Sequence, residues 1–423
     1  MTHRLAFLVL ALSPGVPSPA QAPASIFARD FRVTVSGGSP RGDLLLHPPG
    51  GSGQLVSFAL PEGNHRVIVA FTSAAAAAAT TIKAESRRLV VERGEPAAVA
   101  SVGPEASDPS ANSAAEAART FVVNVRTPAL APPERNAPGG AAVVLNDRER
   151  GSFTWDDRLT LELHAPLGSV RRIDFQPADV PTVYLVGDST VTDQRHEDSA
   201  SWGQMLPRFL GPAVAVANHA ESGETLKSFA TGLRLAKVLE RMRAGDWLFI
   251  QFGHNDQKQQ WPQTYAEAGT TYDAWLKVYL AEARRRGATP VLLTSPQRRT
   301  FDETGRIRNS HGGYPDAVRR VAAEENVALI DLDRASVALY EALGPERAPR
   351  LFAAGGKDAT HHNNFGAYQL AQCVAQGIRD ARLPLAAHLA ADFAGFDPSR
   401  PDDPDRFHLP PSPQRSEETP RGN

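Results

Sequence analysis

The feature that most constrains the fold is a change of pattern at about residue 181. From there on, short apolar runs alternate with amphipathic segments of helical spacing, the last of them at residues 367–381. The runs that predict strands are residues 182–186, 213–217, 247–252, 290–294 and 327–332. Strands that alternate with helices pair in parallel, and the helices cover the faces of the sheet. This half of the chain therefore predicts a doubly wound α/β domain.

Residues 26–176 follow a different pattern, in which apolar and polar residues alternate over short runs. The runs that predict strands are residues 31–35, 66–71, 88–92, 120–125 and 159–163. Clusters rich in Pro and Gly separate them, which is typical of an antiparallel β-sandwich. We interpret the alanine tract Ala74–Ala79 and the Ala-, Ser-, Pro- and Glu-rich residues 96–118 as surface insertions between strands.

The two ends of the chain differ from both domains. An early Arg4, the apolar run Leu5–Leu12 and the small residues Ala20 and Ala22 predict a secretory signal over residues 1–22. We therefore expect the protein to be secreted or periplasmic. Residues 397–423 are rich in Pro, Arg, Asp and Ser and predict a disordered tail.

Composition excludes some classes of partner. The 45 basic and 47 acidic residues nearly balance, and no long block of one sign stands out, which argues against nucleic acid. No run approaches the ~20 apolar residues that span a bilayer, so we expect no membrane insertion. Cys373 is the single cysteine, so the chain can form no internal disulfide, and its helical surroundings predict a buried thiol.

Polar residues suited to acyl chemistry follow successive strands of the predicted sheet. Ser189 follows the first strand, Gly223 the second and Asn255 the third, and Asp358 and His361 lie three positions apart near the C-terminus. The carboxyl ends of parallel strands meet at one edge of a sheet, where ligands bind. A serine, an imidazole and a carboxylate can act there as nucleophile, base and orienting group.

These residues also carry a family resemblance. Gly187-Asp-Ser-Thr190, Gly223, Gly253-His-Asn-Asp256 and Asp358-x-x-His361 resemble, in order, the conserved blocks of the SGNH hydrolases. The longer strings YLVGDSTVTDQ, SWGQMLPRFL, NHAESGETLKSF, FIQFGHNDQK and DATHHNNFGAYQLA are similar to bacterial rhamnogalacturonan acetylesterases, over about residues 181–383.

The resemblance implies both a fold and a site. The implied fold is a three-layer α/β/α, flavodoxin-like domain over residues 181–384, preceded by a galactose-binding-like sandwich over residues 26–176. The implied catalytic triad is Ser189, His361 and Asp358, and the implied oxyanion donors are Ser189, Gly223 and Asn255. No cofactor and no metal belong to this set.

The function expected from this resemblance is that of a secreted serine esterase. It would remove O-acetyl groups from a pectic polysaccharide, with rhamnogalacturonan as the leading substrate. The alternatives are an SGNH esterase for another acetylated glycan or a lipid, and a non-catalytic carbohydrate-binding protein. The sandwich could bind sugar or only pack against the second domain, and we expect small esters to be hydrolysed without it, because every candidate catalytic group lies beyond residue 181.

Other polar and aromatic residues near these blocks have two possible uses. Arg298 and Arg299 could contact a uronate carboxylate or form a solvated basic loop. Trp202 and Trp261 could stack on sugars or pack in the core or at its rim. Glu224 stands where many relatives carry an arginine, which leaves the preferred polysaccharide open.

The remaining motif residues predict structural roles. His219 and His254 are expected to be hydrogen-bonded structural histidines, and Asp256 is expected to hold its own loop. His362 directly follows His361, but adjacent side chains point differently, so we expect no shared metal.

Overall fold

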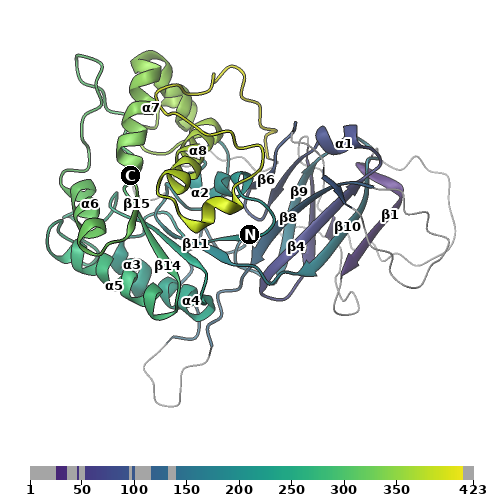
Figure 1. Cartoon of the computed structure of the whole chain (residues 1–423), viewed down its shortest axis with the longest axis horizontal. Helices are drawn as coiled ribbons and strands as arrows, with labels where there is room; N and C mark the ends of the chain where they lie inside the picture. The colour runs from purple at the N-terminus through teal and green to yellow at the C-terminus, as the bar shows by residue number, and fades with distance from the viewer. Residues whose placement is uncertain are drawn as a thin grey trace, which may run out of the picture.

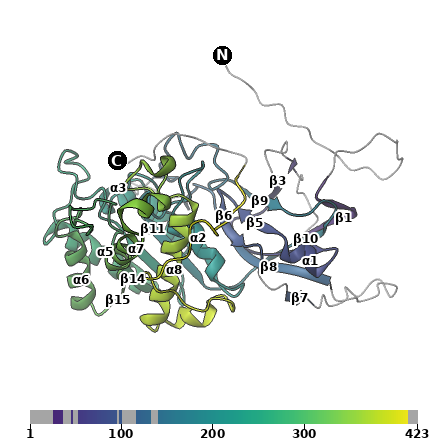
Figure 2. The same cartoon turned by 90° about the horizontal axis from the view of Figure 1, so that it is seen from above.

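The computed structural model describes residues 25–35, 45–46, 53–94, 98–100, 116–131 and 140–412. These residues form a β-sandwich and an α/β domain that lie side by side (Figures 1 and 2). The predicted signal, residues 1–22, lies outside the described residues. Within the described part of the chain, no helix has the length and apolar character needed to cross a membrane.

The sandwich consists of two five-stranded sheets, with strand orders β1-β10-β4-β8-β7 and β2-β3-β9-β5-β6. Its strands are β1 (Phe27–Val35), β2 (Leu45–Leu46), β3 (Gln54–Ala59), β4 (Gly63–Phe71), β5 (Thr81–Ala84), β6 (Arg88–Val91), β7 (Ala98–Ala100), β8 (Glu116–Val125), β9 (Arg158–His164) and β10 (Val170–Pro177). All described pairs are antiparallel except β1 with β10. The predicted antiparallel architecture is therefore confirmed, and the sequence pattern missed the strands β2, β3, β5, β7 and β10.

The alanine tract lies between β4 and β5, as predicted, but only part of it is at the surface, because Ala74 and Ala75 are exposed whereas Ala76 and Ala77 are buried. Residues Ala74–Ala78 form a short helix, α1, whose N-cap Ser73 accepts a hydrogen bond from the Ala76 backbone. Ala77 is fully buried in the sandwich core, and its carbonyl accepts hydrogen bonds from the Arg119 guanidinium. Of the second proposed insertion, residues 96–118, the described parts belong to β7 and β8.

The α/β domain is built on a parallel five-stranded sheet of order β12-β11-β13-β14-β15, as predicted. Its strands are β11 (Thr182–Gly187), β12 (Ala215–Asn218), β13 (Trp247–Gln251), β14 (Thr289–Leu293) and β15 (Ala328–Ile330). Its α-helices are α2 (Trp202–Met205), α3 (Leu226–Thr231), α4 (Arg234–Arg241), α5 (Thr271–Arg285), α6 (Tyr314–Glu324), α7 (Leu332–Arg347) and α8 (Asn364–Asp380). Short 3-10 turns complete it at Leu206–Phe209, Ala348–Leu351, Ala354–Gly356 and Pro384–His388.

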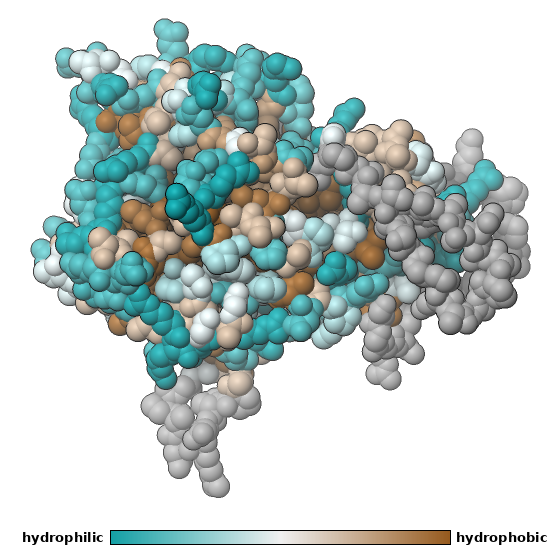
Figure 3. All heavy atoms as spheres, in the orientation of Figure 1, coloured by the Kyte–Doolittle hydropathy of each residue, from teal (hydrophilic) through white to brown (hydrophobic). Residues whose placement is uncertain are grey.

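Both faces of this sheet are buried under helices. In β11, Val183 and Leu185 point into a core shared with α2, α7 and α8. Tyr184 and Val186 point the other way, into a core shared with α3, α4, α5 and α6. Because successive side chains of a strand alternate between faces, a run that is apolar throughout belongs between two helical layers. Figure 3 shows that polar side chains cover much of the outer surface of this domain.

The prediction of a disordered tail from residue 397 is wrong for residues 397–412, which pack on the folded chain. The Phe407 ring lies 5.4 Å from that of Phe365 and 5.2 Å from that of Tyr368. Asp402 accepts hydrogen bonds of 2.7 Å from both Gln369 and Gln372. Composition averages over the whole segment and therefore does not reveal these contacts, which the two residues Phe407 and Asp402 make with α8. Residues 413–423 lie outside the described part.

Candidate active site

Ser189, His361 and Asp358 form a continuous hydrogen-bonded chain at the carboxyl edge of the parallel sheet. The Nε2 atom of His361 lies 2.9 Å from Oγ of Ser189. The Nδ1 atom of the same ring lies 2.9 Å from Oδ2 of Asp358. Ser189 is 3% exposed and His361 is 1% exposed, so the three groups interact in surroundings of low water content. The structure thus brings together three residues that lie up to 172 positions apart in the chain.

The turn after β11 presents Ser189 because Asp188 organises it. Oδ1 of Asp188 accepts hydrogen bonds from the backbone (2.9 Å) and hydroxyl (2.8 Å) of Thr190. Its Oδ2 lies 3.3 Å from Nδ1 of His254, and burial lowers the pKa of His254 below its usual value. A neutral His254 ring therefore donates to Asp188, which is the structural role that the sequence predicts for it. Gly187 is required at the strand end, because a Cβ atom there would lie 2.6 Å from the Gln251 carbonyl oxygen.

Asp358 is held as an acceptor by its own loop. Its Oδ1 accepts backbone hydrogen bonds from Thr360 (2.7 Å) and His361 (2.9 Å). Burial alone would raise the pKa of Asp358, but these bonds and the His361 side chain lower it to about 2. Asp358 is therefore ionised at neutral pH and accepts the Nδ1 proton of His361.

Gly223 and Asn255 lie on the two neighbouring loops. Gly223 has a φ of 85°, a left-handed conformation that favours glycine. Asn255 is fully buried, and its side-chain nitrogen donates to the Glu224 carbonyl at 3.1 Å. A side-chain amide has two N–H donors, so one remains after this bond. Asn255 thereby joins the loop that follows β12 to the loop that follows β13.

Asp256 holds its loop, as predicted. Its two carboxylate oxygens accept backbone hydrogen bonds from Leu226 (2.9 Å) and Gly253 (3.0 Å). Burial raises the pKa of Asp256 to about 7. Both of its oxygens are thus used to fix the loop that carries Asn255.

The two arginines after β14 point to different neighbours. Arg299 donates to the carbonyls of Gly356 (2.7 Å) and Asp358 (3.2 Å), so its guanidinium supports the loop of the triad carboxylate. Arg298 donates to the Ser310 carbonyl at 3.3 Å and lies 3.5 Å from the His254 carbonyl.

The Glu224 carboxylate is bound in a network of hydrogen bonds with Arg234 and Ser228. Its Oε1 accepts from Nε of Arg234 at 3.2 Å, and its Oε2 accepts from the Ser228 hydroxyl. Burial raises the pKa of Glu224.

The two tryptophans lie in different environments, Trp202 in the core and Trp261 at the surface. Trp202 is 1% exposed and donates to the Gln251 side chain at 2.7 Å, so it belongs to the core. Trp261 is 38% exposed, and the Lys258 ammonium lies 4.6 Å from its ring centroid.

The remaining candidates are structural. His362 has its Nε2 atom 2.7 Å from the Tyr340 hydroxyl, away from the triad. His219 packs against the rings of Trp155 and Tyr184, but its buried Nδ1 atom has no hydrogen-bond partner among the described residues, so the predicted hydrogen bond is not found there. Cys373 is buried, and burial raises the pKa of its thiol. The described residues contain no group of three or more His, Cys, Asp or Glu that could hold a metal ion.

The sequence patterns did not identify Gln194 as part of the site. Its side-chain nitrogen donates to the Ser189 carbonyl at 2.7 Å, and its side-chain oxygen accepts from Arg148 of the sandwich half at 3.0 Å. Gln194 is the last residue of the string YLVGDSTVTDQ, close to Ser189 in the sequence. Nothing in that string indicates that Arg148 is its partner.

Comparison with known proteins places this site in a family. Residues 185–370 match the model of the GDSL-like lipase/acylhydrolase family. The rhamnogalacturonan acetylesterase RhgT of Bacillus subtilis is 42% identical over 222 residues, which cover 49% of this chain and 94% of that protein. The probable rhamnogalacturonan acetylesterase YesY of the same organism is 41% identical over 208 residues, which cover 48% of this chain and 94% of that protein.

Among solved structures, the Bacillus subtilis protein YxiM is 23% identical, with a TM-score of 0.49 and coverage of 83% of this chain and 88% of that one. The matched span, residues 185–370, contains Ser189, Gly223, Asn255, Asp358 and His361. The chain therefore belongs to the GDSL-like lipase/acylhydrolase (SGNH hydrolase) family of carboxylic ester hydrolases and resembles its rhamnogalacturonan acetylesterase members.

Proposed function

We propose that this protein is an exported serine acetylesterase that removes O-acetyl groups from a pectic polysaccharide, with rhamnogalacturonan as the leading substrate. The observation that carries the proposal is the hydrogen-bonded chain from Asp358 through His361 to Ser189, with two distances of 2.9 Å. The choice of substrate is supported by two relatives, 42% and 41% identical, whose names include rhamnogalacturonan acetylesterase.

In the proposed reaction, Oγ of Ser189 attacks the acetyl carbonyl carbon while Nε2 of His361 accepts the hydroxyl proton. The tetrahedral intermediate collapses as the bond from the acetyl carbon to the sugar oxygen breaks and His361 returns the proton to that oxygen. The deacetylated sugar departs, and Ser189 remains acetylated. Water, deprotonated by Nε2 of His361, then attacks the acetyl carbonyl carbon. As this second intermediate collapses, His361 returns the proton to Oγ of Ser189 and acetate is released. Asp358 keeps Nδ1 of His361 protonated, so that Nε2 is the atom that accepts and returns the proton.

Three N–H donors would stabilise the negative oxygen of each tetrahedral intermediate: the backbone amides of Ser189 and Gly223 and the side-chain amide of Asn255. Such donors stabilise charge as it develops, and they act without a cofactor. The bond from Asn255 to the Glu224 carbonyl at 3.1 Å supports this role, because it fixes the orientation of the amide.

Two parts of the proposal rest on sequence. Export rests on Arg4 and the apolar run Leu5–Leu12, and it suits a polymeric substrate outside the cytoplasm. A galactose-binding-like identity of the sandwich rests on its strand pattern and on its place before the esterase domain. Arg298 and Arg299 both stay candidate contacts for a uronate, and both guanidinium groups also donate to backbone carbonyls, that of Ser310 and that of Asp358 respectively.

The test is acetate release from a panel of substrates: acetylated rhamnogalacturonan, acetylated xylan, an emulsified lipid ester and p-nitrophenyl acetate. We expect the parent to be most active on acetylated rhamnogalacturonan, and Ser189→Ala to release no acetate while keeping the circular dichroism spectrum of the parent. Near-parental activity of Ser189→Ala would refute the nucleophile. A parent that binds the polymer but hydrolyses none of these esters would instead be a carbohydrate-binding protein.

A further inference from the structure

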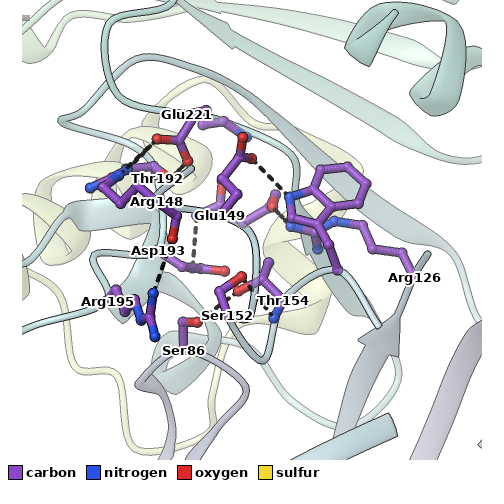
Figure 4. A pocket seen from close by; sticks show the side chains of 13 residues that line it. Ser86, Arg126, Arg148, Glu149, Ser152, Thr154, Thr192, Asp193, Arg195 and Glu221 are labelled. Carbon is purple, nitrogen blue, oxygen red and sulfur yellow. Dashed lines mark hydrogen bonds and ion pairs between the residues drawn. The ribbon is translucent and has the colours of Figure 1, made fainter. Parts of the chain in front are cut away.

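Arg148 reaches from the sandwich half of the chain into the loops of the candidate active site. It lies between β8 and β9, but its guanidinium lines a pocket between the two domains together with Thr192 and Glu221 of the α/β domain (Figure 4). The family model begins only at residue 185, so Arg148 lies outside the part of the chain that defines the family.

One side of the Arg148 guanidinium contacts the loop that carries Ser189. Its Nη1 donates to Oε1 of Gln194 at 3.0 Å, and Nε2 of Gln194 donates to the Ser189 carbonyl at 2.7 Å. Gln194 is buried, and its own carbonyl accepts from Arg87, a second arginine of the sandwich, at 3.1 Å. A single side chain therefore separates Arg148 from the backbone of Ser189.

The other side of the guanidinium contacts the loop that carries Gly223. Nε of Arg148 donates to Oε1 of Glu221 at 3.1 Å, and Nη2 donates to the Ser222 hydroxyl at 2.8 Å. Ser222 directly precedes Gly223 in the chain. Glu221 is buried, and this ion pair is drawn with its dashed contact in Figure 4.

We propose that Arg148 is a positioning residue for the esterase reaction, which fixes the loop of Ser189 relative to the loop of Gly223. The inference rests on the proposed function, since it concerns the spacing between the nucleophile and an oxyanion donor. The planar guanidinium suits this role, because its five N–H donors lie in one rigid plane and can bond both loops at once. The sandwich would then complete the site, contrary to our expectation that small esters are hydrolysed without it.

Arg148 also neutralises a buried carboxylate, so its removal has two effects that must be separated. Removing one partner of a buried ion pair leaves an unpaired charge and destabilises the fold. Replacing both partners by neutral side chains of similar size removes that penalty. The double variant Arg148→Met with Glu221→Gln therefore lacks the bridge between the loops without burying a charge.

The experiment compares kcat, KM and melting temperature for Arg148→Met, Glu221→Gln, the double variant and Arg148→Lys, on p-nitrophenyl acetate. Arg208→Met is the matched control, because Arg208 also joins the two domains, through Nε to Oε2 of Glu92 at 2.8 Å, and it pairs as well with Asp392, which belongs to neither loop of the site. All variants are made in the full chain. Labelling of Ser189 by a fluorophosphonate measures the reactivity of the nucleophile separately.

We expect Arg148→Met to lower kcat by roughly 10–100-fold with KM changed less than about threefold, since small misplacements of reacting groups have effects of this size. The double variant should regain most of the melting temperature but not kcat. Arg148→Lys should be intermediate, because an ammonium lacks the planar fork. Arg208→Met should lower the melting temperature and keep kcat.

Two results would overturn the inference while leaving the proposed function intact. One is a kcat of Arg148→Met within about threefold of the parent. The other is a double variant in which kcat recovers together with the melting temperature, which would reduce Arg148 to a stabilising role. A parent without esterase activity, or an active Ser189→Ala, would refute the proposed function itself.

Discussion

Asn255 gives the sharpest test of the proposed oxyanion site, because its side chain has two separable uses. Its Nδ2 atom donates to the Glu224 carbonyl at 3.1 Å, and its second N–H is free to donate to an oxyanion under the proposed mechanism. Its Oδ1 atom is buried and accepts no hydrogen bond from the described residues. Asn255→Ala removes both N–H donors of the side chain. It breaks no hydrogen bond to Oδ1, because that atom accepts none from the described residues.

The two uses predict different magnitudes. A donor aimed at developing charge contributes about 2.7–4 kcal/mol to the transition state, so kcat should fall roughly 10²–10³-fold. Loss of the bond to Glu224 costs about 1 kcal/mol of folding free energy. That corresponds to a fall of about 2–4 °C in melting temperature for a domain of this size. KM for a small ester should change little, because the donor acts on the oxyanion and not on the bound ester.

The assay is kcat and KM on p-nitrophenyl acetate together with the melting temperature of each variant. Tyr314→Phe is the matched control, because the Tyr314 hydroxyl donates to the Ala266 carbonyl at 2.7 Å and so also supports the loop after β13. We expect the control to lose stability to a similar extent and to keep its kcat. A large fall in stability of Asn255→Ala with less than a tenfold loss in kcat would remove Asn255 from the oxyanion site.

Two further predictions concern the triad and the expectation that no metal takes part in the reaction. Asp358→Asn should lower kcat by about 10⁴-fold by favouring the wrong His361 tautomer, measured on p-nitrophenyl acetate. The folded-state pKa of Asp358 is about 2, below the ~3.9 of a free aspartate, so its contribution to stability is complete above pH ~4 and is lost towards pH 2. The variant should therefore show a flatter melting-temperature profile over that range, and an unchanged profile would contradict this assignment. EDTA should leave the rate unchanged while a fluorophosphonate abolishes it, whereas a loss to EDTA that zinc restores would indicate a metal-dependent deacetylase.

The sequence alone determined the layout of the α/β domain and the residues of the candidate triad. An apolar run such as residues 182–186 can be buried on both faces only between two layers of helices. Because the strands alternate with helices and run parallel, the loops that follow the strands lie at one edge of the sheet. The blocks around Ser189, Gly223, Asn255 and His361 are local strings, so they could be recognised without knowing their contacts. The structure then places His361 within 2.9 Å of both Ser189 and Asp358.

Only the tertiary structure decided the features that depend on contacts between segments far apart in the sequence. The alanine tract forms a short helix that buries Ala76 and Ala77 in the sandwich core, and residues 397–412 pack on the folded chain because Phe407 contacts Phe365 and Tyr368 of α8. Arg148 contacts Gln194 and Glu221, which lie 46 and 73 positions away, and no local pattern records those pairs. The physical reason is that a strand or a motif is encoded by its neighbours in sequence, whereas the partner of a buried charge is fixed only when the two domains pack together.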